Sequence, residues 1–139
     1  MKISTKGRYG LTIMIQLAKN SGGNPLTIKS IAEKGNLSGP YLEQIIALLR
    51  NAGLVKSIRG AKGGYVLVRN PKEITAAEII RVLEGPITPV EGIDNEEPAQ
   101  QSLWIRVRDA VKNVLDSTTL EDLTNSEDVE EQELFMYYI

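Results

Sequence analysis

The residues of this sequence with the clearest chemical role are its basic side chains, which are concentrated in the first half. Residues 1–70 carry eleven Lys and Arg against two acids, a net charge of +9, whereas residues 71–139 carry five bases against sixteen acids, a net charge of −11. Basic side chains grouped in this way can neutralise phosphates and release condensed counterions. The first half is therefore expected to bind a polyanion, with a merely solvated basic surface as the alternative.

The segment 38–50, predicted to be a helix, carries polar side chains that could read base edges. Gln44 can pair with adenine, Glu43 can accept a hydrogen bond from cytosine, and Tyr41 can donate to phosphate or pack on a thymine methyl group. Ser38 and Arg50, at the two ends of the same segment, complete this predicted set of DNA contacts. The alternative is that Tyr41 belongs partly to the core and that Glu43 is an ordinary surface carboxylate.

A second basic group surrounds the glycine-rich stretch 60–64. The guanidinium of Arg59, next to the unhindered backbone of Gly60, could enter a narrow A·T minor groove, and Lys62 could bind phosphate. Further phosphate contacts, which add affinity without sequence information, are expected from the basic side chains near the N-terminus, namely Lys2, Lys6 and Arg8.

The elements that would position these side chains follow from apolar spacing and from helix caps. A helix is predicted over 3–19, with Leu11, Met14, Ile15 and Ala18 on its apolar face. A second begins after Thr27 and ends at Gly35, which is expected to take the left-handed position. A third begins after the N-cap Ser38, with Pro40 in its first turn, and ends at a Schellman motif at Gly53.

Two short β-branched and aromatic runs follow, 54–59 and 65–69, and they predict a hairpin. A helix, a helix-turn-helix and a hairpin in this order predict a mainly helical winged helix-turn-helix with a small β-hairpin wing. The glycine turn between the two short helices is only moderately specific by itself, so the hairpin decides the prediction.

The second half predicts a separate arm. Thr75 and Glu78 indicate a capping box for a helix over 76–84, and Thr118 and Glu121 indicate another for a short helix carrying Leu120 and Leu123. Between them, the longest helix, 99–116, is expected to form a homodimer through an apolar face of Leu103, Trp104, Val107, Ala110, Val111 and Val114. Packing of that face on its own domain is the alternative. The predicted organisation is a DNA-binding domain at 1–84, a connector at 85–98, a dimerisation region at 99–124 and an acidic tail at 125–139.

Composition excludes several classes of function. The chain has no Cys and no His, so no metal site or cofactor is expected, and its carboxylates show no catalytic spacing, so an enzyme is not expected either. No signal peptide or membrane span is indicated, which predicts a cytoplasmic location. A winged-helix module that binds an acidic protein, with no specific DNA operator, is the remaining rival interpretation.

Several segments resemble a known family. The stretches 1–10, 37–38, 41–44, 49–55 and 59–65 are similar to those of the bacterial repressors typified by the iron–sulfur cluster regulator IscR and the nitrite-sensitive repressor NsrR. Within this family, the segments 83–87, 103–106, 109–111, 116–120 and 138–139 most resemble the cysteine-metabolism repressors of low-GC Gram-positive bacteria. The resemblance implies a dimer that binds double-stranded DNA with a dyad operator.

Two departures limit this resemblance. Cluster-binding members carry three cysteines before the long helix, whereas the connector here has none, so no cluster is expected. Gly39 and Pro40 stand where relatives can place a polar side chain, so a base contact made there cannot be carried over.

The C-terminus offers a second kind of partner. Relatives in the cysteine branch act with cysteine synthase (O-acetylserine thiol-lyase), whose active site captures a C-terminal Ile of another enzyme. The terminal Tyr138 and Ile139 of this chain could mimic that terminus and offer their carboxylate to the same site. The alternative is that the tail folds back on the dimer core.

Overall fold

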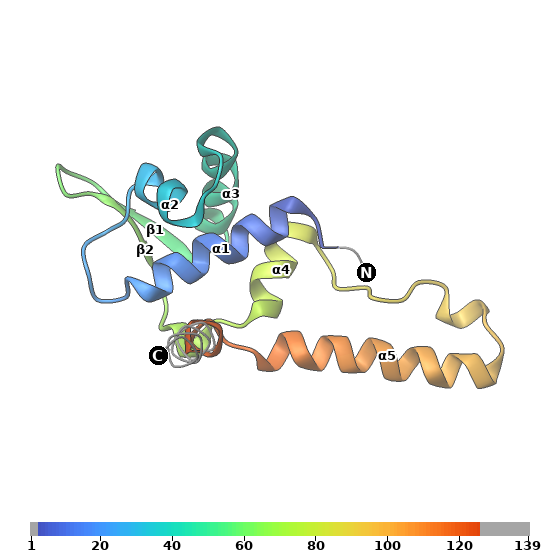
Figure 1. Ribbon diagram of the computed structural model, residues 1–139. Coiled ribbons are helices and arrows are strands. Elements are labelled where there is room, and N and C mark those ends of the chain that lie inside the picture. Colours follow the sequence, from blue (N-terminus) through green and yellow to red (C-terminus); the bar gives the residue numbers. More distant parts are fainter. Residues whose placement is uncertain (1–2, 126–139) are drawn as a thin grey trace, which may run out of the picture.

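The computed structural model describes residues 3–125. Its elements in chain order are α1 (Thr5–Lys19), α2 (Ile28–Gly35), α3 (Gly39–Asn51), β1 (Val55–Ile58), β2 (Gly64–Leu67), η1 (Pro71–Glu73), α4 (Ala76–Glu84), η2 (Ile93–Asn95) and α5 (Pro98–Ser117). A further helical segment covers 120–125. The predicted helical fold with one hairpin is confirmed, and Figure 1 shows α5 extending from the remaining elements as an arm.

The core lies among α1, α3 and α4, and helix α1 passes through its middle (Figure 1). Helix α1 begins after Ser4, whose hydroxyl accepts a hydrogen bond from the Gly7 N–H at 3.3 Å. Its buried face differs from the predicted one: Ile13 and Leu17 are buried, whereas Leu11 and Ile15 are only half-buried. The difference arises because α1 packs on α2, α3, α4 and β2 together, so its apolar residues occupy more than one face.

Both helices of the helix-turn-helix end in Schellman motifs. In α3, Gly53 has a φ of +79°, and the Leu54 N–H donates to the Leu49 carbonyl at 3.0 Å, as predicted. In α2, the left-handed residue is Asn36 with a φ of 54°, so the prediction for Gly35 is wrong by one position. Asparagine tolerates this conformation because its short polar side chain can bond locally.

The hairpin pairs antiparallel, with Val55 opposite Leu67 and Ile58 opposite Gly64. Its base is joined to the segment before α2 by two backbone hydrogen bonds between Leu26 and Tyr65, at 2.7 and 3.1 Å. A side chain at Gly64 would place its Cβ 2.5 Å from the Leu26 carbonyl oxygen, so this close approach requires glycine. The hairpin is thereby fixed to the helix-turn-helix at a defined angle.

The two predicted capping boxes are both revised. At the start of α4, the Glu78 N–H donates to the Thr75 hydroxyl at 3.2 Å, but the Glu78 carboxylate does not return the bond and pairs with Arg69 at 3.1 Å. The second box is shifted by one residue: Thr119 and Asp122 exchange hydrogen bonds of 3.0 and 3.1 Å. The Thr118 hydroxyl instead donates to the Val114 carbonyl at 2.6 Å.

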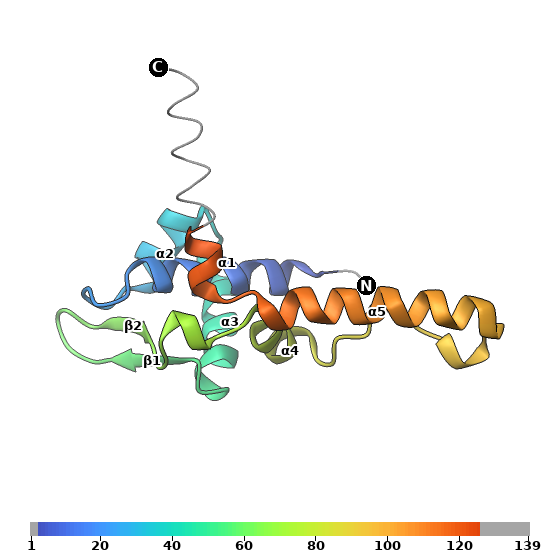
Figure 2. The same ribbon diagram turned by 90° about the horizontal axis from the view of Figure 1, so that it is seen from below.

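Helix α5 is attached to the rest of the structure mainly at its C-terminal end. The Ala76 N–H donates to the Thr118 carbonyl at 2.8 Å, and the Leu120 N–H donates to the Ile74 carbonyl at 2.9 Å. Leu120 is fully buried in the main core. The N-terminal half of α5 lies away from the helix-turn-helix, beside the connector that contains η2 (Figure 2). Within residues 3–125, no helix has the length and apolar character needed to cross a membrane.

Candidate nucleic-acid interface

Helix α3 divides into a buried face and an exposed polar face. Leu42, Ile45 and Leu49 are fully buried, while Glu43 and Gln44, one and two residues after Leu42, are exposed. Within residues 3–125, the Glu43 and Gln44 side chains make neither a hydrogen bond nor an ion pair. Their carboxylate and amide groups are therefore open to an external ligand at the first turns of the helix.

Ser38 takes the predicted N-cap position of α3, whereas the Tyr41 ring, two residues into the helix, packs partly against the core. Ser38 occupies the N-cap position, but its side chain makes no capping hydrogen bond, which leaves an exposed hydroxyl beside the helix N-terminus. The Tyr41 ring is half-buried and packs edge-on against Tyr9, with ring centroids 5.6 Å apart and an interplanar angle of 63°. The ring therefore belongs partly to the core, as the alternative interpretation expected. It joins the start of α3 to the second turn of α1.

The hairpin tip, residues 59–63, carries the second exposed group. Arg59, Gly60 and Lys62 are all exposed, and the turn closes through a hydrogen bond from the Gly63 N–H to the Gly60 carbonyl at 2.9 Å. Gly60 has a φ of +113°, and a Cβ at Gly63 would lie 2.2 Å from the Ile58 carbonyl oxygen. Glycine is thus required for the tight turn that projects the two basic side chains beyond the strands.

The remaining predicted phosphate contacts lie on helices. Arg8 is exposed and Lys6 half-buried in the first turns of α1, and Arg50 is exposed in the last turn of α3. The contact between Tyr9 and Tyr41 brings the start of α1 close to the start of α3, whereas Arg50 lies at the other end of α3. Lys2, the other predicted anchor, lies outside the described residues.

A supporting contact that the sequence did not predict holds the hairpin against α4. The Arg69 guanidinium, two residues after β2, lies 3.1 Å from both carboxylate oxygens of Glu78 and also donates to the Glu73 carbonyl. Only Oε1 accepts a hydrogen bond from Arg69. The other oxygen, Oε2, is buried without a hydrogen bond, and the nearby guanidinium charge compensates its negative charge. The signals available in the sequence were a base at the end of the predicted strand, Arg69, and an acid in the first turn of the predicted helix 76–84, Glu78.

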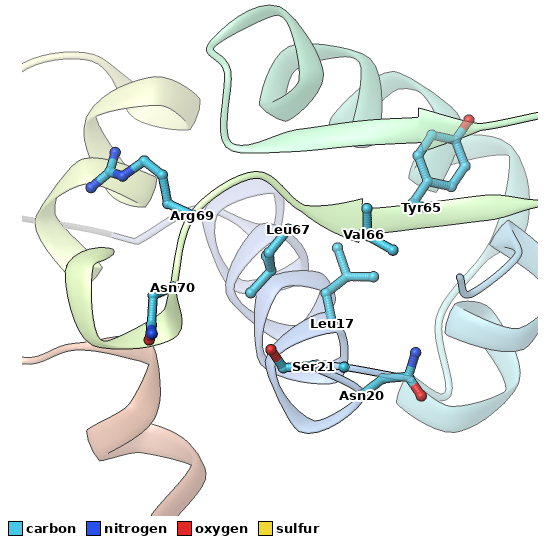
Figure 3. A pocket seen from close by; sticks show the side chains of 9 residues that line it. Leu17, Asn20, Ser21, Tyr65, Val66, Leu67, Arg69 and Asn70 are labelled. Atoms are coloured by element: carbon cyan, nitrogen blue, oxygen red, sulfur yellow. The ribbon is translucent and has the colours of Figure 1, made fainter. Parts of the chain in front are cut away.

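A cavity of about 230 Å³ lies behind the hairpin, between β2 and the end of α1 (Figure 3). Asn20 and Ser21 line it from the α1 side, and Tyr65, Val66 and Leu67 line it from β2. Arg69 points from its rim toward α4 rather than into the cavity (Figure 3). Arg69 is the charged side chain of this lining, and its guanidinium is already paired with Glu78 outside the cavity.

The predicted dimer face on α5 divides into two parts. Leu103, Val107 and Val114 are 47%, 37% and 60% exposed, and Ala110 is also exposed. These four residues, here called the α5 stripe, recur at steps of four, three and four, the spacing of a coiled-coil seam. Trp104 and Val111, also predicted for the dimer face, are half-buried and lie beside the stripe. Helix α5 has no buried residue within the single chain.

A helix-turn-helix with exposed polar residues at the start of its second helix, followed by a hairpin with an exposed basic tip, defines a winged-helix DNA-binding protein. The Rrf2 family, described as an iron-dependent transcriptional regulator, matches residues 3–126. The chain belongs to the Rrf2 family.

Individual relatives agree with this assignment. The chain is 68% identical over 139 residues to the HTH-type transcriptional regulator CymR of Bacillus subtilis, with 100% of both chains covered. It is 34% identical over 135 residues to the regulator IscR of Photorhabdus laumondii, covering 93% of this chain and 82% of that protein. The solved structure of CymR, the global cysteine regulator of B. subtilis, superposes with a TM-score of 0.86 at 69% identity, covering 91% of this chain and 98% of that one. The resemblance to the cysteine branch is confirmed, and the chain is a DNA-binding transcriptional repressor and not an enzyme.

Iron, which the family description names, does not fit the donor atoms of this chain. The sequence contains no Cys and no His, the ligands on which cluster and non-haem iron sites depend. Among residues 3–125, no group of three or more acidic side chains is arranged to hold a metal ion.

Proposed function

We propose that the chain acts as a homodimer that represses genes of cysteine metabolism by binding a dyad operator. The observation that carries this proposal is the pair of exposed polar groups on the basic half, Glu43 and Gln44 on α3 and Arg59 and Lys62 on the hairpin tip. Both groups lack partners within residues 3–125, as expected of side chains whose ligand is another molecule. A symmetric dimer would present two such surfaces to two half-sites.

In this proposal, α3 enters the major groove and the hairpin tip enters the adjacent minor groove. Glu43 and Gln44 contact base edges, and Arg59 with Gly60 follows the minor groove. Tyr41, half-buried against Tyr9, donates its hydroxyl to a phosphate of the DNA backbone. Phosphate contacts come from the remaining basic and hydroxyl side chains, Lys2, Lys6, Arg8, Ser38, Arg50 and Lys62. Residues 1–84 are thus the proposed DNA-binding domain.

The α5 stripe is the proposed dimer seam, within the dimerisation region 99–124. Four apolar side chains exposed at coiled-coil spacing on one helix support this proposal, because water contact with such a row is unfavourable. Trp104 and Val111 lie beside the stripe and would border the seam. The connector, 85–98, would set the distance between the seam and the DNA-binding domain.

The link to cysteine metabolism rests on the 68% identity to CymR of B. subtilis over the full length. Cysteine synthase is the proposed protein partner, and the terminal Tyr138 and Ile139 are the proposed docking residues. Both lie outside the described residues, so their support comes from the sequence alone.

DNA selection tests the regulatory part of the proposal. The wild-type protein is incubated with a random-sequence duplex library, and the selected duplex is compared with a scrambled duplex of equal composition at fixed salt. We expect a dyad sequence and at least about a thousandfold preference for it, the lower end for specific DNA-binding proteins. Equal binding to both duplexes would favour the rival interpretation, a module that binds an acidic protein. Footprinting on the chromosome would then show whether the bound genes belong to cysteine metabolism.

Titration of purified cysteine synthase tests the tail. A chain lacking Ile139 is compared with the full chain and with the control Ile139→Val, which keeps an aliphatic terminal residue. We expect the deletion to abolish complex formation and the control to retain it. Equal binding by all three chains would show that the terminus is not the docking segment, while leaving DNA binding unaffected.

A further inference from the structure

We propose that Glu84 is a positioning residue for the DNA-binding surface, holding the start of α1 in place from the end of α4. The Ser4 N–H donates to Glu84 Oε1 at 2.7 Å, and the Ser4 hydroxyl donates to the same oxygen. The Ser4 hydroxyl also accepts from the Gly7 N–H at 3.3 Å, which makes Ser4 the N-cap of α1. One carboxylate oxygen therefore fixes both donors of the residue from which α1 begins.

This arrangement reproduces a capping box across two helices. In a capping box within one helix, a Glu or Gln at the third helical position accepts from the backbone N–H of the N-cap. The third residue of α1 is Gly7, which has no side chain to do so. A Cβ at Gly7 would lie 2.4 Å from Glu84 Oε1. The carboxylate of Glu84 thus occupies the space that a side chain at residue 7 would fill, and it makes the bond that such a side chain would make.

The position of Glu84 in its own helix supports this interpretation. Glu84 is the last residue of α4, where the helix dipole disfavours an acid, whereas the N-terminus of α1 favours one. The preceding residue, Leu83, approaches α1 equally closely, since a Cβ at Gly10 would lie 1.9 Å from Leu83 Cδ1. The residue types at the end of α4 therefore suit the contact with α1 rather than the helix dipole of α4.

The consequence for DNA binding follows from what the first turns of α1 carry. Lys6 and Arg8 are proposed phosphate contacts, and the next residue, Tyr9, packs against Tyr41 at the start of α3. Glu84 therefore sets the position of the α1 phosphate contacts relative to the recognition helix. This inference rests on the proposed function, because it assumes that α1 and α3 face the same DNA.

The test measures DNA affinity and its salt dependence for Glu84→Ala, Glu84→Gln and a control, Glu91→Ala. Glu91 is an exposed acid of the connector whose side chain has no hydrogen bond or ion pair within residues 3–125. The probe is the duplex that the wild-type protein selects from random DNA. If one phosphate contact per protomer is lost, the slope of log K against log salt falls by about 1.8, and affinity at 0.1 M salt falls up to about sixtyfold.

We expect Glu84→Ala to weaken binding by about tenfold to sixtyfold with a smaller salt slope. Glu84→Gln, whose amide oxygen can accept both Ser4 bonds, and Glu91→Ala should remain within about threefold of wild type. Wild-type affinity and slope in Glu84→Ala would overturn the proposal. So would a loss of affinity with an unchanged slope, because that pattern indicates fewer folded molecules rather than displaced phosphate contacts. Equal losses in Glu84→Ala and Glu84→Gln would also overturn it.

Gly7→Ala provides an independent check of the geometry. Alone it should resemble Glu84→Ala, because the added Cβ displaces the carboxylate; combined with Glu84→Ala it should add little, because the obstructing atoms are gone. Fully additive losses would overturn the proposal. If the wild-type protein selects no sequence at all, the proposed function fails. If wild type and Glu84→Ala prefer the selected duplex over the scrambled one equally and show the same slope of log K against log salt, only the role of Glu84 fails.

Discussion

Substitution of Val114 by Asp tests the proposed dimer seam. Val114 is 60% exposed in the single chain, so a charged side chain there should change the stability of the isolated protomer by less than about 1 kcal/mol. A dimer seam would bury it. Full burial of a valine side chain contributes roughly 1.5 kcal/mol, and the exposed 60% corresponds to about 0.9 kcal/mol in each protomer. Two copies thus contribute about 1.8 kcal/mol, or about twentyfold in the dissociation constant.

The charge adds to this loss, because each seam would hold two unpaired carboxylates removed from water. We therefore expect the dimer dissociation constant to rise by at least about a hundredfold, measured by sedimentation equilibrium over a series of concentrations. The control is Ser102→Asp, which adds the same charge at an exposed position on another face of α5. A monomeric wild-type protein, or a Val114→Asp dimer as tight as the control, would refute the assignment of the seam. Binding to the selected duplex should weaken in parallel, since a monomer holds only one half-site.

Three further predictions concern the two surfaces and the core. Gln44→Ala should cost about 1–3 kcal/mol on the selected duplex and remove the preference at one base pair per half-site, measured with the four possible pairs there; an equal loss on every duplex would contradict base reading. Lys62→Ala should weaken binding to all sequences alike and reduce the salt slope by about 0.9 per protomer, so an unchanged slope would exclude a phosphate contact. Leu120→Ala should lower the free energy of unfolding by about 2–5 kcal/mol in urea, because Leu120 is fully buried, whereas the control Val68→Ala, at a position 47% exposed, should change it far less. Equal losses from both would contradict the anchoring of the C-terminal segment in the core.

The sequence predicted the order and type of the elements well, because most of their signals are local. The apolar spacing, the Schellman motif at Gly53 and the hairpin around a glycine-rich tip depend on neighbours within a few residues. Two of these local predictions were wrong by one residue: the left-handed residue is Asn36 rather than Gly35, and the second capping box begins at Thr119 rather than Thr118. In both cases adjacent residues could satisfy the same geometry, and spacing alone could not choose between them.

The contacts between distant elements could not be predicted from the sequence. Glu78 was expected to cap its own helix, but Arg69 at the end of the hairpin competes for its carboxylate. Tyr41 was expected to face DNA, but Tyr9 of α1 covers part of its ring. Each of these partners lies on another element, and its approach depends on the packing of the whole core. A prediction from local sequence is expected to fail where the side chain binds a partner on a distant element instead of its local one.

Helix α4 is where these tertiary contacts converge. Its first turn is linked to the hairpin through Glu78 and Arg69, its middle to α5 through Arg81 and Asp116 at 3.1 Å, and its last residue, Glu84, to the start of α1. Both ion pairs are partly exposed, and exposed pairs contribute only about 0–1 kcal/mol each, so their effect is on orientation rather than stability. Helix α4 therefore contacts three parts of the structure. These are α5, which carries the proposed dimer seam, the hairpin, and the start of α1, which carries the proposed phosphate contacts. A displacement of α5 would have to move α4, and with it the hairpin and the start of α1, or break the Arg81–Asp116 pair and the two backbone hydrogen bonds that join the end of α5 to the start of α4.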